Sequence, residues 1–288
     1  MDKIVFDGEF FNVKDTLECG QIFRFKEFGE GYKVYSSDKC AYCFNRGNVA
    51  VIECESSDKE YFEKFFDLDR DYMAIFNDAL KENVEILSTA AKLGKGIRIL
   101  NQNPCETLLS FVVSQNNNIP RIKGIIERLC EGLGEVKEFG DEKYHAFPTP
   151  EKLAEKDEEF YKESGLGYRA AYVKRISGEI LDGKIDFDRL NGLSTSELKK
   201  SLVSYYGVGP KVADCTTLFG FHRSDSFPVD TWIDKVYREN FNGEIKERNK
   251  ISEYFTERFA LNAGYYQQYL FYYKRSLEKS SAREGKTV

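Results

Sequence analysis

The sequence predicts an α+β protein in which a small N-terminal antiparallel sheet is followed by a larger helical part. Over residues 3–55, apolar and polar residues alternate in short runs between glycines and charged turns, which is the period of half-buried strands. From residue 57 onward, apolar residues recur at the three- and four-residue spacing of amphipathic helices. The chain has 288 residues, which is enough for two domains with separate cores.

The N-terminal runs are KIVFDGEFFNV, QIFRFKEF, GYKVYS and CAYCFNRGNVAVIEC, and together they indicate a sheet of about five strands. Helices are predicted at 59–67, 71–80, 83–93, 104–115, 119–132, 150–155, 157–163, 168–182, 194–203, 210–219, 231–240, 248–262 and 265–278. Four of them begin at a proline, where the missing N–H is tolerated best: Pro104, Pro120, Pro150 and Pro210. We therefore divide the chain into a sheet domain (1–57), with part of the C-terminal helices packed on it, a helical domain (58–280) and a flexible tail (281–288).

Composition excludes several classes of protein. No segment has the roughly 18 to 20 continuous apolar residues of a membrane span, and the N-terminus lacks a secretory signal pattern. Seven scattered cysteines argue against a disulfide framework, and the lone pair Cys40 and Cys43 fits buried strand positions better than a metal site. We expect a cytoplasmic monomer, associated with the nucleoid if the source is bacterial.

The charge of the chain does not decide whether its partner is a nucleic acid. The net charge of −6 argues against a nucleic-acid partner when taken alone. The stretch GYRAAYVKR, residues 167–175, nevertheless holds three basic residues and no acid. An acidic protein can carry a basic face, so charge neither proves nor excludes DNA binding.

The stretch YYGVGPKVADC, residues 205–215, predicts a tight turn between two helices. Gly207 and Gly209 allow positive φ and close approach to another molecule, and Pro210 can begin the second helix. The free N–H groups at that helix start could hold a phosphate without reading any base. A plain αα-hairpin with a glycine turn explains the same residues, and both interpretations stay open at this point.

Lys211 and Asp230 form a candidate catalytic pair. The helix dipole and burial at the start of a helix both disfavour a charged amine, and a neutral lysine amine is a nucleophile that can form a Schiff base. Asp230 follows nineteen residues later in FPVDTW, where it can cap a helix. A carboxylate held near Lys211 could also deprotonate the amine or stabilise positive charge on a sugar. A surface lysine and an ordinary cap remain the alternative.

Five motifs in register resemble one known family. YYGVGPKVADC followed by PVDTW resembles the helix–hairpin–helix and aspartate signature of the DNA glycosylase superfamily for base excision. CGQIFRF, SQNNNIPRI, GLGYRA and NAGYYQQYLF are similar to segments of its 8-oxoguanine DNA glycosylase/AP lyase family. The resemblance extends from about residue 3 to 278. It implies a helix–hairpin–helix glycosylase domain, with its hairpin at 194–219, and damaged double-stranded DNA as partner.

The resemblance also implies a mechanism and a set of residues. Lys211 would attack C1′ of the damaged nucleotide, remain linked as a Schiff base and nick the strand by β-elimination, with Asp230 assisting; neither metal nor cofactor is needed. The nucleotide would first be flipped out of the duplex. The implied base pocket comprises Gly20, Cys215, Gln267, Phe271 and Trp232. The implied DNA contacts are Asn116, Arg121, Tyr168, Arg169, Gly207 and Gly209.

Two departures and three rivals, the last a helical scaffold, accompany this hypothesis. Trp232 stands where some family members have histidine, and Pro120 stiffens the segment before Arg121, which would read the orphan base. A monofunctional glycosylase for alkylated bases is the first rival, although such enzymes use water and the aspartate without Lys211. A non-enzymatic duplex-binding module is the second, and it gives no reason for a paired lysine and aspartate. A helical scaffold without DNA would show no salt-sensitive DNA binding.

Overall fold

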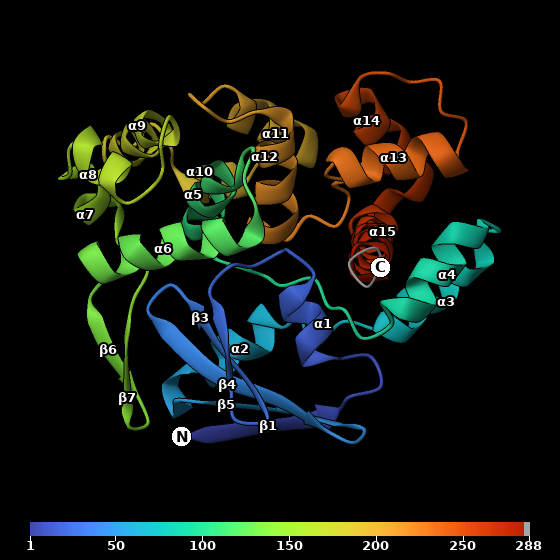
Figure 1. Ribbon diagram of the computed structural model, residues 1–288, viewed down its shortest axis with the longest axis horizontal. Coiled ribbons are helices and arrows are strands. Elements are labelled where there is room, and N and C mark those ends of the chain that lie inside the picture. The colour runs from blue at the N-terminus through green and yellow to red at the C-terminus, as the bar shows by residue number, and fades with distance from the viewer. Residues whose placement is uncertain (285–288) are drawn as a thin grey trace.

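The computed structural model describes residues 1–284 and places a five-stranded antiparallel sheet at one end of the molecule, below the helices (Figure 1). The strand order is β1-β5-β4-β3-β2. The strands are β1 (Asp2–Asp7), β2 (Phe25–Phe28), β3 (Gly31–Ser36), β4 (Lys39–Arg46) and β5 (Val49–Cys54). The predicted sheet of five strands is therefore confirmed. Cys40 and Cys43 both lie buried on β4 as free thiols.

One helix in the N-terminal part was not predicted. Helix α1 (Val13–Glu18) lies between β1 and β2, where the sequence predicted only the connection between two strand runs. Asn12 caps it by accepting a hydrogen bond from the Asp15 N–H, and Val13 and Leu17 are buried one turn apart. The cap and this spacing outweigh the short apolar alternation before them.

The core of the sheet extends beyond the predicted boundary at residue 57. Helix α2 (Lys59–Phe65) packs Phe62, Phe65 and the following Phe66 into the same cluster as the inner sheet residues. Leu100 joins this cluster from the segment before α5. The helix that we placed first in the helical domain thus covers the sheet, because its aromatic face has no other apolar surface to bury against.

The remaining helices form the larger part of the molecule (Figure 1). They are α3 (Tyr72–Lys81), α4 (Glu85–Leu93), α5 (Pro104–Ser114), α6 (Ile119–Leu133), α7 (Pro150–Ala154), α8 (Glu158–Glu163), α9 (Arg169–Leu181), α10 (Phe187–Asn191), α11 (Thr195–Val203), α12 (Pro210–Cys215), α13 (Thr231–Asn240), α14 (Arg248–Phe259) and α15 (Ala263–Glu284). A π-helical turn, Thr216–Gly220, extends α12. None of the helices in residues 1–284 has the length and hydropathy of a membrane span.

Two further elements were not predicted. A hairpin of β6 (Val136–Phe139) and β7 (Glu142–His145) interrupts the helical part, and it turns at Gly140 with φ 59°. Helix α10 is one turn long and begins at the cap Asp186. Both elements are too short for a clear period, and the hairpin strands are rich in charged residues.

Helix α15 joins the two parts of the fold. Its buried face contributes Tyr265, Tyr266, Tyr269 and Leu270 to the helical core. On its other side, Gln268 donates to the carbonyl of Cys19 at 3.0 Å. The helix reaches Glu284, so its backbone enters the predicted tail, in a stretch of alanine, arginine and glutamate that favours helix. Residues 285–288 of that tail lie outside the described residues.

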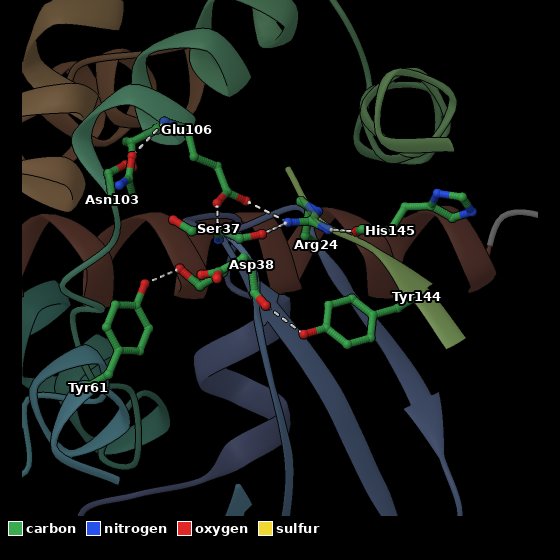
Figure 2. A network of polar contacts seen from close by, with 10 residues as sticks. Arg24, Ser37, Asp38, Tyr61, Asn103, Glu106, Tyr144 and His145 are labelled. Carbon is green, nitrogen blue, oxygen red and sulfur yellow. Dashed lines mark hydrogen bonds and ion pairs between the residues drawn. The ribbon is translucent and has the colours of Figure 1, made fainter. Parts of the chain in front are cut away.

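A buried ion pair ties the sheet to the helical part close to the Gly20 turn (Figure 2). Arg24 Nη1 lies 3.5 Å from Glu106 Oε1, and Glu106 Oε2 accepts from the Ser37 N–H at 2.6 Å. Arg24 Nη2 also donates to the His145 carbonyl at 2.6 Å. Burial raises the pKa of Glu106, while the charge of Arg24 acts in the opposite direction. The network fixes the chain four residues after Gly20.

Candidate active site

A cavity of about 1010 Å³ opens where five parts of the chain meet. The turn at Gly20, the asparagine run after α5, the starts of α12 and α13, and the middle of α15 all line it. Among the predicted site residues, the lining includes Gly20, Asn116, Tyr168, Gly209, Lys211, Asp230, Trp232 and Phe271. Residues separated by up to 251 positions in sequence thus share one cavity. A second cavity, of about 910 Å³, shares Phe23, Ile119 and Arg275 with it.

Lys211 lies in the first turn of α12, as the hairpin motif predicts. Gly209 is the N-cap of this helix and Pro210 its first residue. The Lys211 side chain is partly buried, and its Nζ lies 4.7 Å from the centroid of the Phe111 ring. The Phe111 ring holds the amine at the cavity, and Lys211 forms no ion pair with another residue in the described part of the chain.

Asp230 is the N-cap of α13. Its Oδ1 accepts hydrogen bonds from the N–H groups of Trp232 (2.9 Å) and Ile233 (3.0 Å). Burial raises the pKa of Asp230 above its usual value, and the Ile233 hydrogen bond and the charge of Lys211 act in the opposite direction. Asp230 therefore caps α13 and also interacts electrostatically with Lys211.

The far wall of the cavity is formed by the Gly20 turn against α15. Gly20 has φ +95°, and a Cβ there would lie 3.2 Å from the Phe271 ring and 3.3 Å from Arg275 Nη1. A larger residue would close this approach. Cys215 lies one turn after Lys211 and is buried behind the lining; burial raises the pKa of its thiol to about 11, although the Lys211 charge opposes this shift.

Gln267 is buried on α15 and is not part of the cavity lining. Its Nε2 donates to the Pro228 carbonyl at 3.1 Å. Its Oε1 is buried and accepts no hydrogen bond from any described residue. An unpaired buried acceptor of this kind costs free energy.

Of the predicted DNA-contacting residues, Asn116, Tyr168 and Gly209 line the cavity. Asn116 is exposed and has φ 47°, in the left-handed region that asparagine tolerates. Tyr168 is 54% exposed beside it. Arg121 is exposed outside the lining, with Nη2 at 3.4 Å from the Gly165 carbonyl. Arg169 is buried instead, and its guanidinium donates to main-chain carbonyls of the neighbouring loops.

The hairpin itself is built as predicted. Ser194 and Glu197 form a reciprocal capping box at the start of α11. The turn before α12 passes through Gly207 at φ +82°, where a Cβ would lie only 2.4 Å from Tyr172 Cγ. Glycine is therefore required at this position both for its conformation and for its contact.

Several lining residues were not predicted. Phe23, Phe111 and Arg275 form part of the wall, and Arg275 follows Phe271 by one turn on α15, a spacing that could have found it. Trp232, which was predicted, also lines the cavity, and Lys235 Nζ lies 5.1 Å from the centroid of its ring. Within residues described by the structure, no group of histidine, cysteine, aspartate and glutamate side chains could hold a metal ion.

Comparisons with known proteins agree with this architecture. Residues 3–108 match the model of the 8-oxoguanine DNA glycosylase N-terminal domain, and residues 109–260 match the HhH-GPD superfamily of base excision DNA repair proteins. An N-glycosylase/DNA lyase of Saccharomyces cerevisiae is 31% identical over 280 residues, covering 86% of this chain and 73% of that protein. A protein of Methanothermobacter thermautotrophicus described as a probable N-glycosylase/DNA lyase is 30% identical, covering 75% of each chain.

A solved structure is similar over nearly the whole chain. The 8-oxoguanine glycosylase/lyase of Clostridium acetobutylicum, in complex with double-stranded DNA containing cytosine opposite 8-oxoguanine, has a TM-score of 0.89 and 36% identity. The match covers 94% of this chain and 93% of that one. The fold is that of the helix–hairpin–helix class of base excision proteins. Within that class, the chain belongs to the 8-oxoguanine DNA glycosylase family.

Proposed function

We propose that Lys211 is the nucleophile and Asp230 its assisting carboxylate in an enzyme that removes 8-oxoguanine from duplex DNA and then nicks the strand. As a member of its family, the chain is a DNA N-glycosylase with DNA lyase activity. The observation that carries the residue assignment is that Lys211 and Asp230, at the starts of two separate helices, line the same cavity.

The chemistry follows from an amine beside a carboxylate. The neutral amine of Lys211 attacks C1′, the nitrogen–carbon bond forms, and the bond from C1′ to the base breaks, so that the base leaves and takes up a proton. Asp230 stabilises the positive charge that develops on the sugar. Ring opening gives the lysine Schiff base. Loss of a proton from C2′ then expels the 3′ phosphate, which is the strand cleavage.

The base pocket offers the features needed to select an oxidised guanine. The carbonyl of Gly20 would accept the N7–H of 8-oxoguanine, whereas normal guanine carries a lone pair at N7 and would repel it. Phe271 and the Cys215 side would enclose the ring. The buried Oε1 of Gln267 would accept from the Watson–Crick edge of the base. Trp232 would close the mouth.

The exposed edge of the cavity would hold the opened duplex. Because C1′ is out of reach in a stacked duplex, the nucleotide must be flipped. Asn116 and Tyr168 would fill and wedge the gap, Arg121 would contact the orphan base, and Arg169 would support them. The turn at Gly207 and Gly209 would approach the phosphates. We also propose that the enzyme acts as a monomer in the cytoplasm, with the nucleoid as its location in a bacterium.

Borohydride trapping tests the assignment. The protein is mixed with a duplex containing 8-oxoguanine opposite cytosine, borohydride is added, and covalent adducts are resolved on a denaturing gel, with Lys211→Gln and undamaged duplex as controls. We expect a lesion-dependent adduct that disappears in the variant. Base release from an intact strand without an adduct would favour the monofunctional glycosylase, and the absence of both would leave only a binding module or scaffold.

A further inference from the structure

Three segments that border the cavity meet at Gln115, the residue that ends α5. The first is the asparagine run 116–118, which directly follows it. The second is the start of α9 at residues 168–169. The third is the hairpin turn at 204–209, which leads into the helix of Lys211. These segments carry every predicted DNA contact except Arg121, which begins α6.

The main chain of Gln115 binds the start of α9. Its carbonyl accepts a hydrogen bond from Arg169 Nε at 2.8 Å, a second from Arg169 Nη2, and a longer one from the Tyr168 hydroxyl at 3.4 Å. Arg169 Nη2 also donates to the Asn116 carbonyl at 2.9 Å. Arg169 is only 3% exposed, so its guanidinium is committed to these carbonyls and holds Asn116 and Tyr168 at a fixed spacing.

The side chain of Gln115 binds the hairpin turn. Its Nε2 donates to the Gly207 carbonyl at 2.9 Å and to the Val112 carbonyl of its own helix at 3.3 Å. Tyr172 packs against Gly207, and its ring lies 5.8 Å from that of Tyr168. The hairpin turn is therefore held by an amide and by an aromatic ring, and both connect it to the wedge at Tyr168.

The conformation of the neighbouring residue depends on these bonds. Asn116 has φ 47°, a conformation that costs a non-glycine residue free energy and persists only where surrounding contacts hold it. Arg169 donates to the carbonyl on each side of Asn116, that of Gln115 and that of Asn116 itself. One residue thus joins the strained loop to the turn from which α12 begins.

We propose that Gln115 is a positioning residue that presets the spacing between the wedge formed by Asn116 and Tyr168 and the hairpin turn that leads to Lys211. This inference rests on the proposed function. Preset spacing lowers the ordering cost of engaging the opened duplex at several points at once. Loss of the Gln115 amide therefore impairs extrusion of a stacked base and leaves the chemistry at Lys211 intact.

The test compares two substrates with Gln115→Met, which keeps the length of the side chain and removes its N–H donors. One duplex carries 8-oxoguanine opposite cytosine, and the other carries a preformed abasic site, which has no base to unstack. Single-turnover strand cleavage and borohydride trapping are measured on both. Ser177→Ala is the matched control, because it removes another side-chain bond to a carbonyl, from Ser177 Oγ to Val173 O at 2.8 Å within α9.

We expect Gln115→Met to cleave the 8-oxoguanine duplex roughly five- to tenfold more slowly than the wild type and the abasic duplex within about twofold of it. Ser177→Ala stays within about twofold on both substrates. Equal slowing on both substrates, or no slowing on either, would overturn the positioning role. A wild-type protein that forms no adduct with either duplex would instead overturn the proposed function, so the two failures are distinguishable.

Discussion

Asp230 caps α13 and, as a carboxylate, would supply a negative charge to the cavity. The substitution Asp230→Asn separates these two roles. An asparagine Oδ1 can accept the same bonds from the N–H groups of Trp232 and Ile233, and asparagine and aspartate are equivalent caps. Asp230→Asn therefore keeps the cap and removes the charge. Asp230→Ala removes both, which costs about 1 kcal/mol of unfolding free energy, or roughly 2–4 °C in Tm.

The sign of the charge effect follows from the pKa of Asp230. Burial raises this pKa in the folded state above 3.8, so the folded protein disfavours the carboxylate relative to the unfolded chain. This destabilisation is present above the folded pKa and disappears as the pH falls below 3.8. At pH 7 we expect Asp230→Asn to unfold at or above the Tm of the wild type, and the difference to close in acid.

Excision activity should fall in Asp230→Asn even though its stability does not. Both variants lose the carboxylate, so single-turnover excision of 8-oxoguanine should fall by about 10²–10⁴ in each. Thermal unfolding at pH 7 and at about pH 3, below the unfolded pKa, and excision at pH 7 are the measurements. The reasoning is refuted if Asp230→Asn lowers Tm as much as Asp230→Ala, or if it excises the base at the rate of the wild type.

Three other variants test neighbouring parts of the structure. Arg24→Met leaves the Glu106 carboxylate buried without its cation and should lower the unfolding free energy measured in urea by about 3–5 kcal/mol. Adding Glu106→Gln should recover part of this loss, and an unchanged urea midpoint in Arg24→Met would contradict the reasoning. Gly207→Ala meets the Tyr172 ring at positive φ and should cost more than about 1 kcal/mol, whereas wild-type stability would show that the turn can relax. Phe271→Ala removes a wall of the cavity and should lower kcat/KM for 8-oxoguanine at least about fivefold while sparing the abasic duplex; equal loss on both would assign Phe271 to folding.

The sequence predicted those parts of the fold whose pattern is long enough to show a period. The five strands of the sheet alternate over four to eight residues each, and the longer helices carry clear apolar faces. Helix α1 has six residues, and α10 has five. The strands β6 and β7 have four residues each, with charged side chains among them. Elements this short are predicted only where the sequence marks them, as Pro150 marks the start of the five-residue α7 and the longer run QIFRFKEF contains β2. The others are determined by the surfaces they pack against, which the sequence does not display.

For the candidate site, the sequence located residues that belong to local motifs. Lys211, Gly209 and Asp230 each stand at the start of a helix, and the turn chemistry before the helix identifies them. Gln115 and Arg169 could not be assigned in this way. Their bonds span 92 and 54 positions respectively, and a buried arginine among carbonyls looks the same in sequence as an exposed arginine on DNA. Tertiary packing alone distinguishes the two.

Glu106 and Gln267 are both buried, and they differ in how their side-chain oxygens are satisfied. At Glu106, burial is offset inside the protein, since each carboxylate oxygen has its own donor in Arg24 or Ser37. Gln267 Oε1 lacks any such partner among the described residues, although the side chain is only 4% exposed. An unpaired buried oxygen costs free energy, as do the other unpaired buried atoms of the core, such as the Tyr269 hydroxyl. The Gln267 oxygen would gain a partner if, as we propose, it accepts from the N–H groups at the edge of a flipped base.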